Sequence, residues 1–263
     1  MTEQRGGSRK FDIVPHCPFC LPDPGLVLMS TPRLHVLVAT GSIVPGHTVI
    51  VSKEHAPSLV NSGLRAAGAD LLRVRGLVAA MSRLEYGKDT QFFEHGAGCQ
   101  HEQSHVFCAH AHMHALPTSL TTTQTAFVVK QMRCQFTNYT AMTESETIAW
   151  YNSNREDEYF YFSGSGRHHV FYPDHRSRPA PRLFRRLFAQ VLGLEPETVV
   201  NWEEQAEKTD LAMTAGRLRD ALRDVTRSAR PPDLHPTGGA SDDAGPVDAV
   251  APQVRERHYG PTD

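Results

Sequence analysis

Three histidines alternate with apolar residues in the segment His110–Leu116, which reads His-Ala-His-Met-His-Ala-Leu. A period of two is typical of a β-strand, because successive side chains point to opposite faces of the sheet. The three imidazoles would then lie on one face, each about 6.5–7 Å from the next, and the intervening apolar residues would enter a core on the other. Buried imidazoles without partners are costly, so three in register indicate chemistry rather than packing.

Two kinds of chemistry suit such a strand. A His-x-His pair can bind a metal ion for oxygenase or hydration chemistry. Alternatively, a neutral imidazole can attack a phosphorus atom and form a covalent phosphoramidate that a second nucleophile resolves. The alternation by itself leaves both open, since each needs its imidazoles on one face.

The rest of the chain alternates between strand and helix patterns. The runs 33–39 and 47–52 are apolar and β-branched, and they lie close enough in sequence to pair as antiparallel neighbours. Strands joined by short turns, with helices between the groups, predict an α+β fold. Further strands are expected at 90–94, 106–116, 158–162 and 169–172, and helices at 64–86, 125–133, 182–192 and 208–227.

Charge and composition exclude several classes of protein. The chain has 27 Lys and Arg against 29 Asp and Glu, and this balance argues against a nucleic-acid partner. No apolar run is long enough to span a membrane, and no apolar segment follows the N-terminal residues as in a signal peptide. We therefore expect a cytoplasmic protein without a membrane partner. The odd number of cysteines, 5, then indicates thiols or metal ligands rather than disulfides.

The motif and two segments upstream resemble the histidine triad superfamily. All seven positions of His110–Leu116 fit its pattern, in which histidines and apolar residues alternate. The segment 46–55, Gly-His-Thr-Val-Ile-Val-Ser-Lys-Glu-His, looks like the stretch that precedes the triad in that superfamily, and Cys17-Pro18-Phe19-Cys20 looks like the Cys-x-x-Cys of many bacterial members. The resemblance covers about residues 15–118 and implies an antiparallel sheet with flanking helices.

This resemblance also implies a domain organisation. A flexible N-terminus (1–14) would precede a catalytic domain of the histidine triad type (15–140), a C-terminal α/β extension (141–228) and a disordered tail (229–263). The tail has its own evidence, because 230–263 contains 6 prolines and 4 glycines in 34 residues and few large apolar side chains.

The activity implied by the resemblance is that of a nucleotidyl hydrolase or transferase. His112 would be the nucleophile toward the α-phosphorus of a nucleotide, and His114 would donate a hydrogen bond to the phosphate oxygens. The substrates would be dinucleoside polyphosphates, nucleoside phosphoramidates or nucleotide sugars, and the chain would form a homodimer. The candidate nucleotide-binding residues are His47, Glu94, His95, Ser104 and His105.

The metal ligands implied by the same resemblance are Cys17, Cys20, His55 and His110, which make a complete set for structural zinc. A redox role for the Cys-x-x-Cys is disfavoured, because it needs a helix starting at the first cysteine, and Pro22 and Pro24 follow at once. The remaining alternative is a vestigial site with free thiols.

One departure from the superfamily pattern bears on function. Many histidine triad proteins carry Ser or Thr five residues before the nucleophile to protonate the leaving group, and this chain has Phe107 there. A zinc-stabilised nucleotide-binding regulatory module with little turnover is therefore an alternative, and an enzyme that binds metal with the triad itself is a weaker one. Arg182, Arg185 and Arg186 form a basic helix face that could reach a phosphate-bearing substrate, but such a run is more often solvated, and a solvated face is what we expect.

Overall fold

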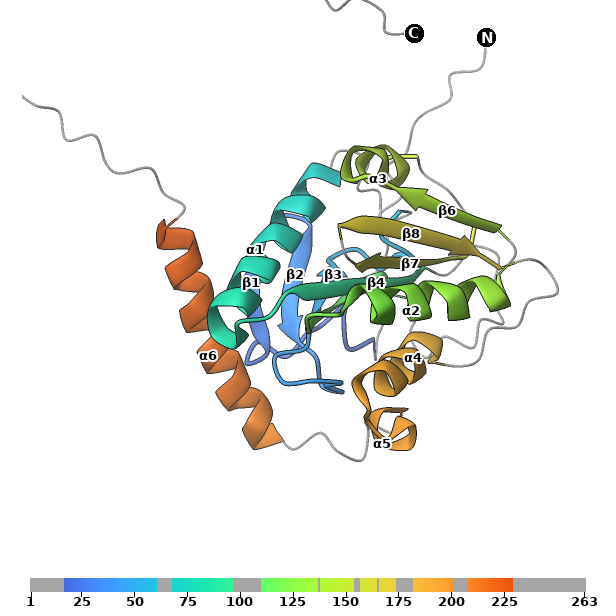
Figure 1. Cartoon of the computed structure of the whole chain (residues 1–263). Coiled ribbons are helices and arrows are strands. Elements are labelled where there is room, and N and C mark those ends of the chain that lie inside the picture. Colours follow the sequence, from blue (N-terminus) through green and yellow to red (C-terminus); the bar gives the residue numbers. More distant parts are fainter. Residues whose placement is uncertain are drawn as a thin grey trace, which may run out of the picture. The chain divides into compact units, whose positions relative to one another are not determined.

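The computed structural model describes residues 17–60, 68–96, 110–136, 138–153, 157–164, 166–173, 182–200 and 208–228. Its strands form one eight-stranded antiparallel sheet in the order β1-β2-β3-β5-β4-β7-β8-β6 (Figure 1). The strands are β1 (Val27–Ser30), β2 (Leu34–Val38), β3 (Thr48–Ser52), β4 (Thr90–Gly96), β5 (His112–Pro117), β6 (Asn138–Met142), β7 (Tyr159–Gly164) and β8 (Arg167–Tyr172). The predicted α+β class with an antiparallel sheet and flanking helices is confirmed.

Helices cover both faces of this sheet. The helices of the described residues are α1 (Gly68–Tyr86), α2 (Thr122–Gln135), α3 (Glu144–Tyr151), α4 (Leu183–Leu192), α5 (Pro196–Val200) and α6 (Lys208–Ser228). Side chains of α1, α3 and α6 share one apolar core with the sheet, whereas α2, α4 and α5 contribute to a second. Helices α1 and α6 lie side by side (Figure 1), and α6 packs against β1 and β2 whereas α1 packs against β5 and β4.

The alternation of the histidine strand separates these two faces. Ala111, Met113 and Ala115 are fully buried in the core that α1 covers. Strand β5 lies between β3 and β4, with His114 opposite both Val49 and Phe93. The period of two in the sequence thus corresponds to one face for packing and one for chemistry.

Several predicted elements are confirmed. The runs predicted to pair do so as β2 and β3, with Val36 opposite Ile50, and β7 pairs with β8 as expected. Helix α2 begins three residues earlier than predicted because Thr121 and Gln124 form a capping box. Helix α4 ends at Gly193, whose φ of 67° is a left-handed conformation that suits glycine.

Four described elements have no counterpart in the sequence-based prediction, namely β1, β6, α3 and the short helix α5. Strands β1 and β6 are short edge strands whose residues alternate only weakly. Helix α3 starts at another capping box, in which Thr143 and Glu146 exchange hydrogen bonds. That Thr-x-x-Glu spacing was a readable signal for a helix start.

Some predictions fall on residues that the structure does not describe. The N-terminal segment 1–14 and the tail 229–263 are among them, as are the first residues of the helix predicted at 64–86. Within the described part of the chain, no helix combines the length and apolar character that crossing a bilayer requires.

Candidate active site and metal centre

The central histidine of the triad, His112, is held in one tautomer by the backbone carbonyl of His110, two residues before it. Nδ1 of His112 lies 2.7 Å from the carbonyl oxygen of His110. Because a carbonyl only accepts, Nδ1 must carry the proton, and Nε2 of a neutral His112 keeps its lone pair. The ring of Phe19, from the Cys-x-x-Cys loop, packs against His112 at a centroid distance of 4.9 Å.

A second pair of imidazoles forms a directed chain beside it. The backbone N–H of Ile43 donates to Nδ1 of His47, so a neutral His47 carries its proton on Nε2. That Nε2 lies 2.9 Å from Nδ1 of His114 and donates to it. The remaining proton of His114 is then on Nε2, the nitrogen that is free to donate to a ligand.

Burial keeps these rings neutral. It is the main reason why the pKa of His47 and that of His114 lie well below 6.5, and the nearby charge of Arg185 acts in the same direction. Burial also lowers the pKa of His112, although the hydrogen bond to the His110 carbonyl opposes this shift. At neutral pH His112 therefore presents an unprotonated Nε2, and His114 presents an N–H donor.

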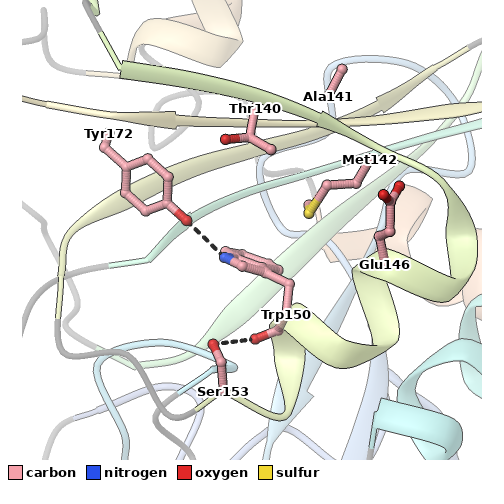
Figure 2. A pocket seen from close by; sticks show the side chains of 7 residues that line it. All are labelled: Thr140, Ala141, Met142, Glu146, Trp150, Ser153 and Tyr172. Carbon is pink, nitrogen blue, oxygen red and sulfur yellow. Dashed lines mark hydrogen bonds between the residues drawn. The ribbon is translucent and has the colours of Figure 1, made fainter.

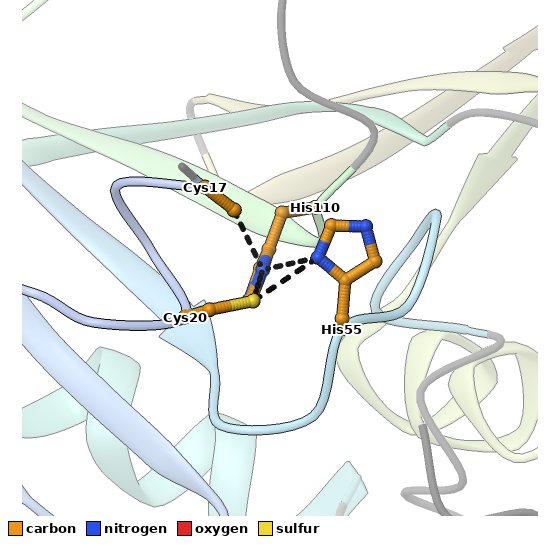
Figure 3. A group of neighbouring side chains, drawn as sticks. All are labelled: Cys17, Cys20, His55 and His110. Atoms are coloured by element: carbon orange, nitrogen blue, oxygen red, sulfur yellow. Dashed lines mark hydrogen bonds between the residues drawn. The ribbon is translucent and has the colours of Figure 1, made fainter. Parts of the chain in front are cut away.

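The four residues nominated as metal ligands come together in space. The potential ligand atoms of Cys17, Cys20, His55 and His110 all lie within 4.8 Å of one another (Figure 3). Cys17 and Cys20 come from the turn before β1, His55 from the segment after β3, and His110 from the residues just before β5. This is the set of four residues that the resemblance to the histidine triad superfamily implies as metal ligands.

The spacing of this cluster suits a tetrahedral ion. The Sγ atom of Cys20 lies 3.2 Å from Nδ1 of His55 and 3.6 Å from Nδ1 of His110. The two Nδ1 atoms are 3.2 Å apart, and neighbouring ligands of a tetrahedral zinc are separated by about 3.3–3.8 Å. Nε2 of His110 donates to the Ser52 carbonyl at 2.7 Å, which leaves Nδ1 as the ligand atom. These four residues therefore fit a metal ion.

His95 also lies on the chemical face, with a partner that the sequence did not indicate. Its ring stacks on Phe160 at 4.0 Å, and its Nε2 is 2.7 Å from a carboxylate oxygen of Glu158. His95 is close enough to His112 to help lower the pKa of that ring. His95 and Glu158 are 63 residues apart in the chain, a separation at which sequence reading has no signal.

Glu94 points the other way, toward the face that α1 covers. It is fully buried and accepts a hydrogen bond from the backbone N–H of Leu59 at 2.8 Å. Neighbouring residues of a strand alternate between faces, and Phe93 stacks on His114, so Glu94 is directed away from the triad. The structure therefore does not bring Glu94 together with His47 and His95, the other described candidates for nucleotide binding.

Replacing Glu94 with glutamine is expected to remove a pH dependence of stability. Burial raises the pKa of Glu94 from 4.5 to about 8, so the folded protein binds a proton that the unfolded chain releases. This contribution is complete below the unfolded pKa and is lost as the pH rises through the folded pKa. Between pH 6 and 8, wild type should lose up to about 1.4 kcal/mol per pH unit relative to Glu94→Gln. Urea unfolding of both proteins measures this difference, and a constant difference across the range would contradict the assignment.

Helix α4 supports the site from the C-terminal part of the chain. Phe93 stacks on His114 at a centroid distance of 4.6 Å, and Phe184 and Phe188 of α4 pack against the Phe93 ring at 4.9 and 5.1 Å. Arg185 is buried, contrary to the solvated face expected for this basic run. It is buried because its guanidinium donates to the carbonyl oxygens of Val199 and Gly41.

The remaining candidates lie outside the described residues. These are Ser104 and His105, together with Phe107 at the position usually occupied by a hydroxyl residue.

A separate surface hollow is lined by Thr140, Met142, Glu146, Trp150 and Tyr172, among others (Figure 2). The indole N–H of Trp150 donates to the Tyr172 hydroxyl there. The hollow lies along the edge strand β6, and none of the candidate site residues is among the residues that line it.

Comparison with family models and with curated proteins gives no match. Several solved structures are similar. Yeast Ap4A phosphorylase Apa2 in complex with AMP has 16% identity and a TM-score of 0.38, over 60% of this chain and 64% of that chain, which is less than two thirds of its length. An ADP-glucose phosphorylase from Arabidopsis thaliana with bound ADP-glucose has 11% identity and a TM-score of 0.35, over 73% and 91%. A uridylyltransferase has 13% identity and a TM-score of 0.35, and the match covers 80% of this chain and 92% of that chain.

Proposed function

We propose that this chain is a nucleotidyl hydrolase or transferase that forms a covalent intermediate on His112. The observation that carries the proposal is the hydrogen bond from Nδ1 of His112 to the His110 carbonyl, which leaves Nε2 as a lone-pair nucleophile. The folded protein already holds the ring in this tautomer, so substrate binding does not include the free-energy cost of selecting it.

The reaction would proceed in two displacements. In the first, Nε2 of His112 attacks the α-phosphorus, and the bond to the leaving group breaks with its electron pair on the departing atom. In the second, water or an acceptor hydroxyl attacks the same phosphorus and releases its proton to solvent, and the electron pair of the phosphorus–nitrogen bond returns to Nε2. The His110 carbonyl, which accepts from Nδ1, would stabilise the positive ring of the intermediate.

The neighbouring imidazoles have distinct proposed roles. His114 would donate from Nε2 to the phosphate oxygens as charge develops on them, and His47 would hold His114 in that tautomer. His95, paired with Glu158, would contact the nucleotide from β4. The proposed substrates have phosphoanhydride, phosphoramidate or phosphoester leaving groups, and we propose a homodimer as the assembled form.

We propose zinc as the ion of the Cys17, Cys20, His55 and His110 cluster, because two thiolates and two imidazoles form a complete structural set. When bound, the ion would supply folding free energy and fix His110. His110 then connects the metal centre to the reaction, since its own carbonyl orients His112.

The test of the reaction is detection of the intermediate. The zinc-loaded full chain is mixed with a dinucleoside polyphosphate, a nucleoside phosphoramidate and a nucleotide sugar in turn, and it is quenched without acid. Intact-mass and peptide spectra should show one nucleoside monophosphate on His112 with at least one substrate. Tight binding of nucleoside monophosphates without adduct or turnover would favour the zinc-stabilised binding module instead.

A further inference from the structure

A buried positive charge lies beside the candidate site, and the described residues offer it no negative partner. Arg185 is 8% exposed, and its Nε and Nη2 donate to the carbonyl oxygens of Val199 and Gly41 at 2.9 and 2.7 Å. Among the residues that the structure describes, no carboxylate forms an ion pair with it, and the charged neighbour that affects it most is another cation, Arg182. Burial lowers the pKa of Arg185 to about 10, so it is still charged at neutral pH.

An uncompensated buried cation is costly, because it loses hydration without gaining an opposite charge. Carbonyl oxygens reduce this cost through their dipoles but do not neutralise the charge. The neutral imidazoles of His47 and His114 do not neutralise it either. In the absence of a carboxylate from the described part of the chain, a bound anion is the natural partner.

The position of Arg185 connects its charge to the triad. Gly41, which accepts from Nη2, lies in the same loop as Ile43, whose N–H donates to His47. His47 in turn donates to His114. The charge of Arg185 lowers the pKa of both rings, which shows that its field reaches them. The residue next to Arg185, Phe184, contacts the Phe93 ring on which His114 stacks.

We propose that Arg185 supplies the positive charge that balances the phosphate of a nucleotide bound at His112 and His114. This inference rests on the proposed function for the location of the phosphate, but not on whether the phosphate is then transferred. It also assigns part of the nucleotide site to helix α4, far along the chain from the triad.

The experiment compares a nucleotide with its nucleoside. Calorimetry on the zinc-loaded full chain first identifies which of AMP, GMP, CMP and UMP binds best, and then measures that nucleotide and its matching nucleoside. Arg185→Gln should weaken nucleotide binding about tenfold or more, a size typical of charge interactions away from bulk water, and should leave nucleoside binding within about twofold. Arg185→Lys, which keeps the charge, should restore most of the difference. Arg186→Gln, on the same helix but partly exposed, is the matched control and should change neither affinity.

The ratio of nucleotide to nucleoside affinity distinguishes an effect of the Arg185 charge on the phosphate from a structural effect of the Arg185 side chain. Equal weakening of nucleotide and nucleoside in Arg185→Gln would show that Arg185 only holds the loop around Gly41, and it would overturn the inference. An unchanged nucleotide affinity would overturn it as well. Charge-dependent binding without an adduct on His112 would support this inference while contradicting the proposed reaction, so the two failures are distinguishable.

A measurement on the unmodified protein covers the case in which Arg185→Gln does not fold. Surface charges are screened as salt rises, whereas buried charges are screened much less. The ratio of nucleotide to nucleoside affinity should therefore change less than about twofold between 50 and 300 mM NaCl. A steep fall of this ratio toward 1 would assign the phosphate to exposed cations and overturn the inference.

Discussion

His112→Asn is expected to abolish turnover and to eliminate the nucleotidyl adduct, while nucleoside monophosphate binding survives. Asparagine occupies similar space but offers no nucleophilic nitrogen, so the first displacement has no substitute group. Removal of a catalytic nucleophile commonly lowers kcat by about 10⁴-fold or more, because the remaining residues act only through it. Single-turnover assays with the substrate that gives the adduct in wild type measure this loss.

Two comparisons make that result specific. His114→Asn should keep the adduct but form it more slowly, by about 10²–10³-fold, since it removes a donor to the phosphate and not the nucleophile. His35→Asn is the control, because His35 is partly exposed on β2 and bonds to the Ser30 hydroxyl rather than to the site. Substantial turnover by His112→Asn would contradict the covalent mechanism.

Cys20→Ser is expected to reduce bound zinc from one ion per chain to near zero and to destabilise the protein strongly. Cys20 contacts both histidines of the cluster, so its loss opens the tetrahedral set. Structural zinc contributes folding free energy directly, and a loss of several kcal/mol lowers Tm by about 10 °C in a domain of this size. Activity should fall too, because His110 positions His112 through its carbonyl.

The control for this variant is Cys134→Ser, which removes an exposed free thiol from the last turn of α2. It should change neither zinc content nor Tm. Zinc is quantified by elemental analysis on protein purified without added metal, and unfolding is followed by circular dichroism. One zinc per chain that persists in Cys20→Ser would contradict the assignment, whereas zinc that is lost from His112→Asn as well would favour metal binding by the triad.

The sequence anticipated much of the fold near the triad and less of it elsewhere. Strands such as β2 and β3 are five-residue apolar runs bounded by turns, and their pairing follows from short-range chain geometry. Edge strand β6 carries no comparable pattern, since most of its residues are exposed and its place is determined by pairing with β8. Weak alternation of this kind is indistinguishable from a loop until the neighbouring strand is known.

The candidate site shows the same division. The metal cluster assembled as the family motifs implied, although Cys17 and His110 are 93 residues apart. Glu94 and His95 are adjacent in sequence and were nominated together, yet a strand directs them to opposite faces, so only His95 lies near the triad. The partnership of His95 with Glu158 depended on the pairing of β4 with β7, which no local pattern specifies.

The sequence by itself determined the strand of His112 and His114, the face that these two imidazoles share and, through the family resemblance, the four residues that gather at the metal centre. These follow from side-chain alternation and from recognisable motifs, which are properties of short segments. Only the tertiary structure decided that Glu94 is buried away from the triad and that Arg185, 144 residues from Gly41, is buried against the loop of His47. The physical reason is that burial and long-range hydrogen bonds depend on how sheets and helices pack, and the same basic run is solvated or buried according to what lies against it.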